Sequence, residues 1–170
     1  ADKGHKTEEA INKIDEDLTR YLIDLSSEPL SQKESEVLTN ILDSSRDLER
    51  IGDHGEALIN LTDYIRRKKV EFSPAALQEL DLIYNMTLSF IKESLKSVED
   101  NDIELANSLV AKHEAIDKME RRLRKTHIHR LNRGECSTQA GVNFIDIISH
   151  YTRVADHAMN LAEKVQAEQI

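Results

Sequence analysis

The chain has 170 residues, of which 32% are charged and only 4% are aromatic, and it contains just 5 Gly and 2 Pro. This composition favours long helices over β-sheet. The formal net charge of −9 argues against binding to nucleic acids or anionic membranes, which both favour basic surfaces. Cys136 is the single cysteine, so an intrachain disulfide is excluded and a reducing compartment fits. No apolar stretch of about 18 residues is present, so we expect no membrane insertion of this segment.

Apolar residues recur at steps of three and four along most of the chain, which predicts an all-α fold. Pro29 ends the first helix, and Ser31 with Glu34 forms a capping box for the second. Ser73, followed by a proline, and Ser137, after a glycine turn, predict two further helix starts, and an acidic break separates the third helix from the fourth. The expected helices span about residues 7–26, 35–68, 74–98, 103–132 and 138–168.

The same spacing predicts which side chains face the core. On the second helix the packed face includes Val37, Ile41 and Leu48. On the third helix the inward positions include Leu77, Tyr84 and Leu95.

Two stretches of the chain recur at a distance of about 100 residues. Residues 9–15 resemble residues 114–120, and Arg-Ile-Gly-Asp-His at 50–54 resembles Arg-Val-Ala-Asp-His at 153–157. A repeat of this length is one helical bundle, so we expect two tandem bundles, residues 1–72 and 73–170. The first copy lacks a counterpart of the helix at 74–98, because the alignment places that helix before residue 1.

Several acidic residues lie beside the packed seams in both copies. Glu49 and Asp53 are four residues apart, so they lie one above the other on the second helix. Like charges at the edge of a core are unfavourable unless a proton, a cation or a metal compensates for them. Helical bundles build metal sites from acids on facing helices, and oxygen donors suit Mg, Ca, Mn or iron. The candidate ligands are Asp15, Glu49, Asp53, Asp117, Glu120 and Asp156.

Other interpretations of these residues stay open. The acids also fit solvated helix flanks on which they pair with neighbouring arginines. Thr152 stands where the first copy has Glu49, so the second site is weaker or depends on Asp117 and Glu120. His54 and His157 recur about 100° around the helix from the adjacent aspartates, so we expect them to pack or form hydrogen bonds.

The Leu-Glu-Arg-Ile-Gly-Asp-His stretch at 48–54 and its repeat resemble the PhoU family of phosphate-signalling proteins. The resemblance covers almost the whole chain and implies two tandem antiparallel three-helix bundles, the first lacking its opening helix here. It also implies multinuclear iron or zinc clusters, or another divalent cation, held by Glu49, Asp53 and Asp156. The roles of Asp15, Asp117 and Glu120 come from the residue pattern alone.

The resemblance leaves two functions open, both regulatory and non-catalytic. Because the chain begins without a methionine or the first helix, the leading hypothesis is the cytoplasmic C-terminal domain of a bacterial Na⁺/phosphate cotransporter. Such a domain would control phosphate uptake through metal or phosphate status. It would contact the membrane-embedded transporter region of the same or a partner chain, at the inner face of the cell membrane.

The alternative is a free-standing adaptor that regulates a phosphate ABC transporter and its two-component signalling. A metal-dependent hydrolase that uses clustered carboxylates is a third class, but the sequence shows no evident general acid. A purely structural bundle is a fourth. A bundle that lacks one helix exposes an apolar stripe, so we also expect a homo-oligomer or an intramolecular partner.

Overall fold

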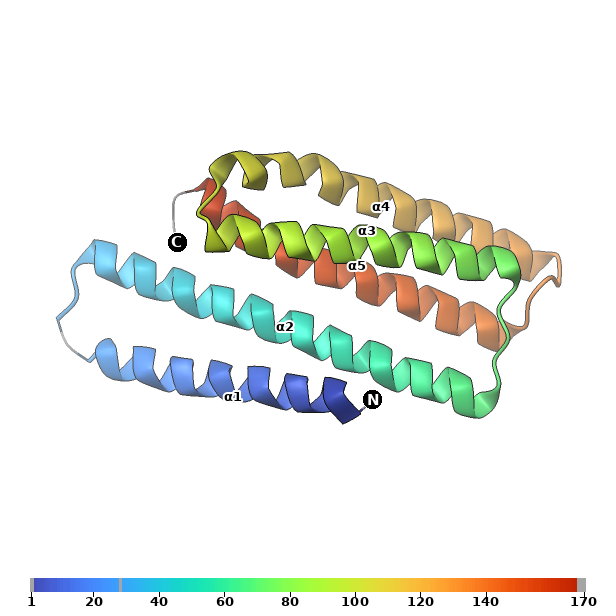
Figure 1. Cartoon of the computed structure of the whole chain (residues 1–170), viewed down its shortest axis with the longest axis horizontal. Coiled ribbons are helices and arrows are strands. Elements are labelled where there is room, and N and C mark those ends of the chain that lie inside the picture. The colour runs from blue at the N-terminus through green and yellow to red at the C-terminus, as the bar shows by residue number, and fades with distance from the viewer. Residues whose placement is uncertain (1, 28, 168–170) are drawn as a thin grey trace.

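The computed structural model describes residues 2–27 and 29–167, and their regular structure is entirely helical, which confirms the all-α prediction (Figure 1). No helix in these residues combines the length and apolar character needed to cross a membrane. The helices within this part of the chain are α1 (Asp2–Leu25), α2 (Gln32–Lys68), α3 (Pro74–Glu99), α4 (Ile103–Asn132) and α5 (Thr138–Gln166).

The helix starts follow the predicted caps. The Ser31 side chain accepts a hydrogen bond from the backbone of Glu34, whose carboxylate accepts one from the Ser31 backbone in return. Ser73, Asp102 and Ser137 cap α3, α4 and α5 in the same way through one side-chain oxygen each. These side chains satisfy backbone N–H groups that have no partner within the helix, which fixes where each helix begins.

Helix α1 begins at Asp2, five residues before the predicted start at residue 7. Thr7 lies within the helix, and its hydroxyl donates to the carbonyl of Lys3 one turn earlier, at 3.0 Å. A threonine in this arrangement lies inside a helix, so the predicted start at residue 7 was wrong.

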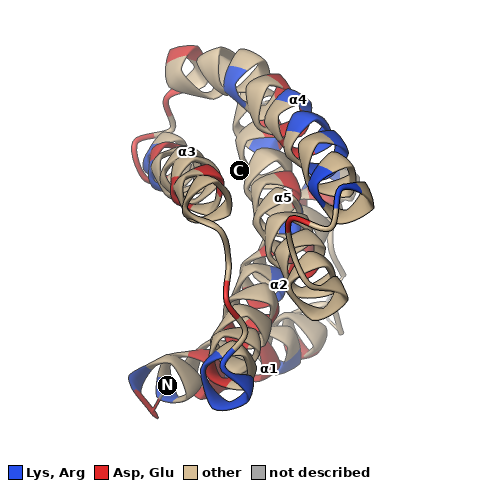
Figure 2. Ribbon diagram, turned by 90° about the vertical axis from the view of Figure 1, so that its right-hand side faces the viewer, with Lys and Arg blue, Asp and Glu red and all other residues tan. Residues whose placement is uncertain are grey.

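Helix α5 is the centre of the molecule. It contacts α2, α3 and α4, whereas α1 contacts α2 alone among the described helices. Helices α3, α4 and α5 run alternately up and down as a bundle, and the α1–α2 hairpin lies beside α5 (Figures 1 and 2). The division into two domains at residue 72 stays a prediction.

The main core lies inside the α3–α5 bundle. Ile51 of α2 also packs against this core, so the hairpin and the bundle share apolar contacts. In the hairpin, Gly52 allows a close approach, because a Cβ at this position would lie 3.3 Å from the Ile11 side chain of α1. The fully buried large apolar residues of the bundle include Ile83, Phe90, Leu109, Ile116, Leu123, Phe144 and Ile148.

Some predicted core positions are exposed. On α3, Leu77 and Tyr84 keep 52% and 43% of their surface, and on α2 Val37 and Leu48 keep 43% and 41%. Leu95 and Ile41 are likewise exposed. Periodicity identifies an apolar face, but the number of neighbouring helices decides how wide a face is buried. Of the helices in the described part of the chain, α3 contacts α4 and α5 alone, so its outer flank faces solvent.

An apolar groove of about 540 Å³ runs between α1 and α2 near their connecting loop. Its lining includes Leu22, Leu25, Val37 and Ile41. The expected homo-oligomer or intramolecular partner stays a prediction.

Helices α2 and α5 meet in an antiparallel arrangement that relates the two repeats to each other. The alignment that pairs His54 with His157 also pairs Asp47 with His150. In the structure, Asp47 of α2 contacts His157 of α5, and His54 of α2 contacts His150 of α5. Each contact therefore joins one repeat position on α2 to the other repeat position on α5, and the second contact is the first with the two helices interchanged. The repeats are therefore related by an approximate two-fold axis that passes between α2 and α5.

The histidines at this interface form hydrogen bonds, as predicted. Nδ1 of His54 lies 3.1 Å from Nδ1 of His150, and the ring of His54 stacks on that of His157. Burial, followed by the nearby His150, His157 and Arg153, lowers the pKa of His54. A neutral imidazole suits this contact, because Nδ1 of one histidine must be unprotonated to accept the hydrogen bond that the N–H of the other histidine donates.

Asp47 is the buried anchor of the interface, with 9% of its surface exposed. Its carboxylate accepts hydrogen bonds from His157 and Asn160 at 2.9 Å and from Lys164 at 3.1 Å. Burial alone would raise the pKa of Asp47, but these hydrogen bonds from Asn160, His157 and Lys164 outweigh it and hold the pKa below its usual value. The charged form therefore stabilises the contact between α2 and α5.

We expect Asp47→Ala to lower the free energy of unfolding by about 3 kcal/mol at neutral pH, because Lys164 and His157 lose their partner in a buried site. A lowered pKa means that this contribution is present above the ordinary aspartate pKa and is lost as the pH falls through the folded-state value. Urea unfolding of both proteins at several pH values measures the difference. The matched control is Asp43→Ala, which removes an exposed pair with Arg46 and should change little. An equal effect of the two substitutions would contradict the anchoring role.

Candidate metal centre

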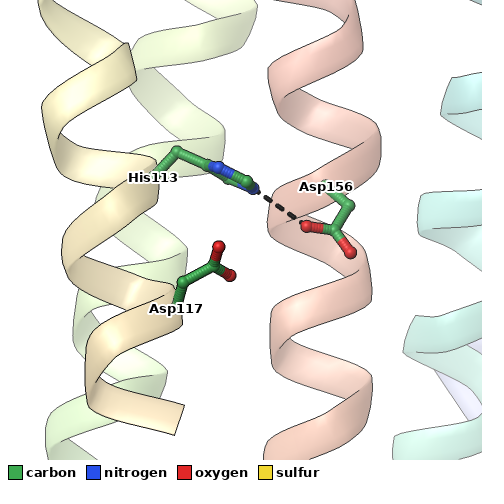
Figure 3. Close-up of side chains that lie close together, drawn as sticks. All are labelled: His113, Asp117 and Asp156. Atoms are coloured by element: carbon green, nitrogen blue, oxygen red, sulfur yellow. Dashed lines mark hydrogen bonds and ion pairs between the residues drawn. The ribbon is translucent and has the colours of Figure 1, made fainter. Parts of the chain in front are cut away.

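One cluster in the second repeat combines a histidine with two aspartates. His113 and Asp117 lie four residues apart on α4, so they share a face, and Asp156 faces them from α5. Nε2 of His113 lies 2.9 Å from Oδ1 of Asp156, and one ligand atom from each residue lies within 4.8 Å of the others. Figure 3 shows Asp117 directed toward the same space as the other two side chains. Within residues 2–27 and 29–167, no other group of three such residues meets this distance.

The cluster sits at the surface but is supported from the core. The His113 ring packs at 5.8 Å from the ring of the buried Phe90, which restricts its orientation. The side chain of His113 is 22% exposed and that of Asp156 is 51% exposed. An ion could therefore reach the ligand atoms directly from solvent.

Two positions that would extend this cluster are engaged elsewhere. The Glu120 carboxylate accepts a hydrogen bond from Nε of Arg124 at 2.8 Å, and Arg124 also donates to Ser149. The hydroxyl of Thr152 donates to the backbone carbonyl of Ile148 at 3.0 Å. Glu120 is thus paired with a guanidinium and is not a member of the group formed by His113, Asp117 and Asp156.

The first repeat brings three of the predicted acids together. Burial, then the charge of Asp53, raises the pKa of Glu49, and Asp15 contributes in the same direction. Arg50 partly offsets this repulsion, since its guanidinium lies 3.3 Å from Asp53 and 3.7 Å from Glu49. Asp15 also accepts a hydrogen bond from Ser45 at 2.5 Å.

The repeat alignment adds two residues to this first cluster. Glu8 and Asn12 stand at the positions of His113 and Asp117, and Asn12 donates a hydrogen bond to Glu8. Oδ1 of Asn12 is buried and has no hydrogen-bond partner among the described residues. A buried oxygen without a donor, on a side chain that contacts the carboxylate of Glu8, fits a site that accepts a cation.

The donor atoms therefore suit divalent cations in both repeats, but the two repeats offer different kinds of donor atom. The first repeat offers only oxygen donors, which favour hard ions, whereas the second adds the imidazole nitrogen of His113. We did not expect His113 from the sequence. Its position four residues before Asp117 was the available signal, because that spacing places both on one helix face.

The comparisons with known proteins identify relatives along most of the chain. A family model described as the PhoU domain matches residues 1–62 and 80–165. The "Phosphate-specific transport system accessory protein PhoU homolog 1" of Thermotoga maritima is 32% identical over 133 residues, which are 78% of this chain and 56% of that protein. The PhoU homolog of Streptococcus pneumoniae serotype 4 is 28% identical over 126 residues, with 74% and 57% covered. The chain thus spans just over half the length of these curated relatives.

Solved structures share the fold. The crystal structure of PhoU from Pseudomonas aeruginosa aligns with a TM-score of 0.87 at 19% identity and covers 96% of this chain and 78% of that chain. The structure of the phosphate transport system regulatory protein PhoU from Streptococcus pneumoniae aligns with a TM-score of 0.80 at 22% identity and covers 96% and 76%.

The hypothesis of a Na⁺/phosphate cotransporter domain is wrong. The relatives are named as accessory and regulatory proteins of phosphate transport systems, which agrees with the alternative interpretation. The hypothesis depended on how the chain begins, and the first residue of a chain carries no physical information about its partners.

The cluster of Asp15, Glu49 and Asp53 leads to a test in metal-free protein. Since the pKa of Glu49 is raised, its charged form destabilises the fold at neutral pH. We expect Glu49→Gln to raise the thermal midpoint by about 1–2 °C at pH 7 in the presence of a chelator. The gain should disappear as the pH falls below the ordinary glutamate pKa, where the native residue is itself protonated.

Differential scanning calorimetry of both proteins provides the measurement. Glu36→Gln, at an exposed position on the same helix, is the matched control and should leave the midpoint unchanged. A lower midpoint for Glu49→Gln than for the native chain in chelator at pH 7 would contradict the repulsion between these carboxylates.

Proposed function

Since the chain belongs to the PhoU domain family, we propose that it is a non-catalytic, cytoplasmic regulator of phosphate transport. The observation that carries this proposal is the match of the PhoU domain to both repeats. The relatives' names, which describe accessory proteins of phosphate-specific transport systems, support it. In this role the protein restrains a phosphate ABC transporter, and the two-component signalling linked to it, according to phosphate or metal status.

A basic segment of α4 suits contact with such partners at the inner face of the membrane. Arg121, Arg122 and Lys125 are exposed on α4, and none of them forms a hydrogen bond or an ion pair within the described residues. Figure 2 shows basic residues on successive turns of this helix. In a chain with a net charge of −9, these unpaired cations form a distinct surface that attracts an acidic partner.

The two acidic clusters supply the link to metal status. Each cluster lies between two helices of its own repeat, so an ion bound there would join α1 to α2 or α4 to α5. An ion that binds only when the two helices are packed together stabilises that packing by mass action. The protein then has a metal-bound and a metal-free state. The two states would then differ in their contacts with the transporter.

We expect that deleting the gene that encodes this chain raises phosphate uptake and phosphate-starvation gene expression in phosphate-replete medium. Reintroducing the native gene should restore repression. A triple variant with Arg121→Glu, Arg122→Glu and Lys125→Glu should fail to restore it, because charge reversal repels the partner that the basic segment attracts. Uptake of labelled phosphate and a reporter for the starvation response provide the measurements.

The matched control reverses the same number of charges elsewhere. Lys13→Glu, Lys33→Glu and Lys92→Glu change exposed lysines of other helices and should restore repression as the native gene does. Circular dichroism confirms that both triple variants fold. Unchanged uptake and reporter expression after deletion would contradict the proposed function, whereas restoration by both triple variants would contradict only the role of the basic segment.

A further inference from the structure

We propose that Cys136 is a modification site, at which the disulfide of a small acidic peptide, such as glutathione disulfide, forms a mixed disulfide with the thiol. The site lies where α2 ends and α5 begins, at one end of the molecule (Figure 1). None of the residues that line it belongs to the acidic clusters. The inference goes beyond the proposed function and does not depend on it.

The thiol belongs to the wall of a cavity of about 780 Å³. The last turns of α2, the connection at 69–73 and residues 135–139 before and within the first turn of α5 line this cavity. Its volume lies in the range of sites that bind small organic molecules. Cys136 is half-buried and is one of the lining residues, so a ligand in the cavity lies beside the thiol.

A buried histidine lies behind the thiol. Nε2 of His127 is 3.9 Å from Sγ of Cys136 and has no other polar partner among the described residues. His127 is only 1% exposed, and its ring stacks on that of Phe144 at 4.3 Å, which fixes its orientation. A thiol is a weak acceptor, whereas a negatively charged sulfur would satisfy this buried nitrogen far better.

Arg130 determines which ring nitrogen of His127 carries the proton. Its guanidinium nitrogen Nη2 lies 3.2 Å from Nδ1 of His127. A guanidinium can only donate, so Nδ1 accepts and the proton is on Nε2. Burial, followed by the Arg130 guanidinium, lowers the pKa of His127, so the ring is neutral at pH 7. His127 therefore donates an N–H toward the sulfur, and this hydrogen bond favours the thiolate, which is the form that attacks a disulfide.

The charges around the cavity indicate the class of ligand. Lys68 and Lys69 line the cavity, and neither side chain forms a hydrogen bond or an ion pair within the described part of the chain. The carboxylate of Glu71 is likewise unpaired there, whereas that of Glu135 lies 3.7 Å from Arg133. A peptide such as glutathione, which has more carboxylates than ammonium groups, complements this set of charges.

The reaction is a thiol–disulfide exchange. The sulfur of deprotonated Cys136 attacks one sulfur of the small disulfide, so that a new S–S bond forms and the old one breaks. The other half leaves as a thiolate and takes a proton from solvent, which had received the proton of Cys136. Cys136 is oxidised and the leaving half is reduced, so no further oxidant is needed. The adduct would lie in a cavity lined by both α2 and the start of α5, so it would contact both elements.

The test uses the full chain, whose single cysteine makes the reaction easy to follow. Reduced protein is freed of reductant and mixed with glutathione disulfide at pH 7, and mass spectrometry of the intact chain measures the rate of adduct formation. The same thiol in protein unfolded by urea gives the reference rate. We expect the folded protein to react at least about tenfold faster than this reference.

Variants separate the two contributions. His127→Phe removes the N–H but keeps an aromatic ring against Phe144, and it should lower the rate to the reference value. Lys68→Gln with Lys69→Asn should slow the reaction with glutathione disulfide but not that with uncharged hydroxyethyl disulfide. Asparagine suits position 69, because the backbone there is left-handed, with a φ of 52°. The matched control, Lys13→Gln with Lys92→Gln, removes two exposed lysines elsewhere and should change neither rate.

Two results would overturn the proposal. A folded protein that reacts no faster than the urea reference would show that the surroundings of Cys136 do not activate the thiol. Equal rates with glutathione disulfide for the native chain and the Lys68→Gln, Lys69→Asn variant would remove the acidic peptide as the ligand class. If His127→Phe does not fold, as judged by circular dichroism, the comparison of native with unfolded protein still decides whether the thiol is activated.

Discussion

The contact between α2 and α5, anchored by the Asp47 carboxylate, holds the two repeats together. Asp47 is nearly buried and accepts hydrogen bonds from three side chains of α5, so its charge is stabilised only when the two helices are in register. A carboxylate in this position tolerates little displacement, because each lost donor leaves a buried polar group without a partner. It therefore fixes the relative position of the hairpin and the bundle more sharply than apolar packing alone would.

This register also organises the candidate metal centres. His54 and His157 lie at the interface, and each directly follows an aspartate of an acidic cluster, Asp53 or Asp156. Neighbouring residues of a helix point about 100° apart. When the histidine lies in the interface between α2 and α5, the aspartate before it therefore points toward the other helices of its own repeat. The two-fold relation thus places equivalent clusters in the two repeats, but the sequences have diverged into an all-oxygen set and a set that includes His113.

Local signals in the sequence predicted the starts of the four capped helices, α2 to α5, because capping depends on residues within one turn of each other, as for Ser31 and Glu34. The repeat predicted the pairing of acids across helices, and the structure brings Asp117 and Asp156 close to each other. Sequence analysis missed Asp47 as an anchor and expected Leu77 and Leu48 in the core. Both errors have one cause: the side of a helix that meets a neighbour depends on tertiary packing, which periodicity in one segment does not record.

Among the described helices, α1 contacts α2 alone, so it is the helix whose local opening disturbs the least of the structure. Asp15, Asn12 and Glu8 belong to this helix, whereas Glu49 and Asp53 belong to α2. Opening of α1 therefore splits the donor set of the first repeat and leaves that of the second repeat intact. An ion bound in the first repeat would hold α1 against α2, and the fraction of molecules with α1 closed would rise with the concentration of that ion.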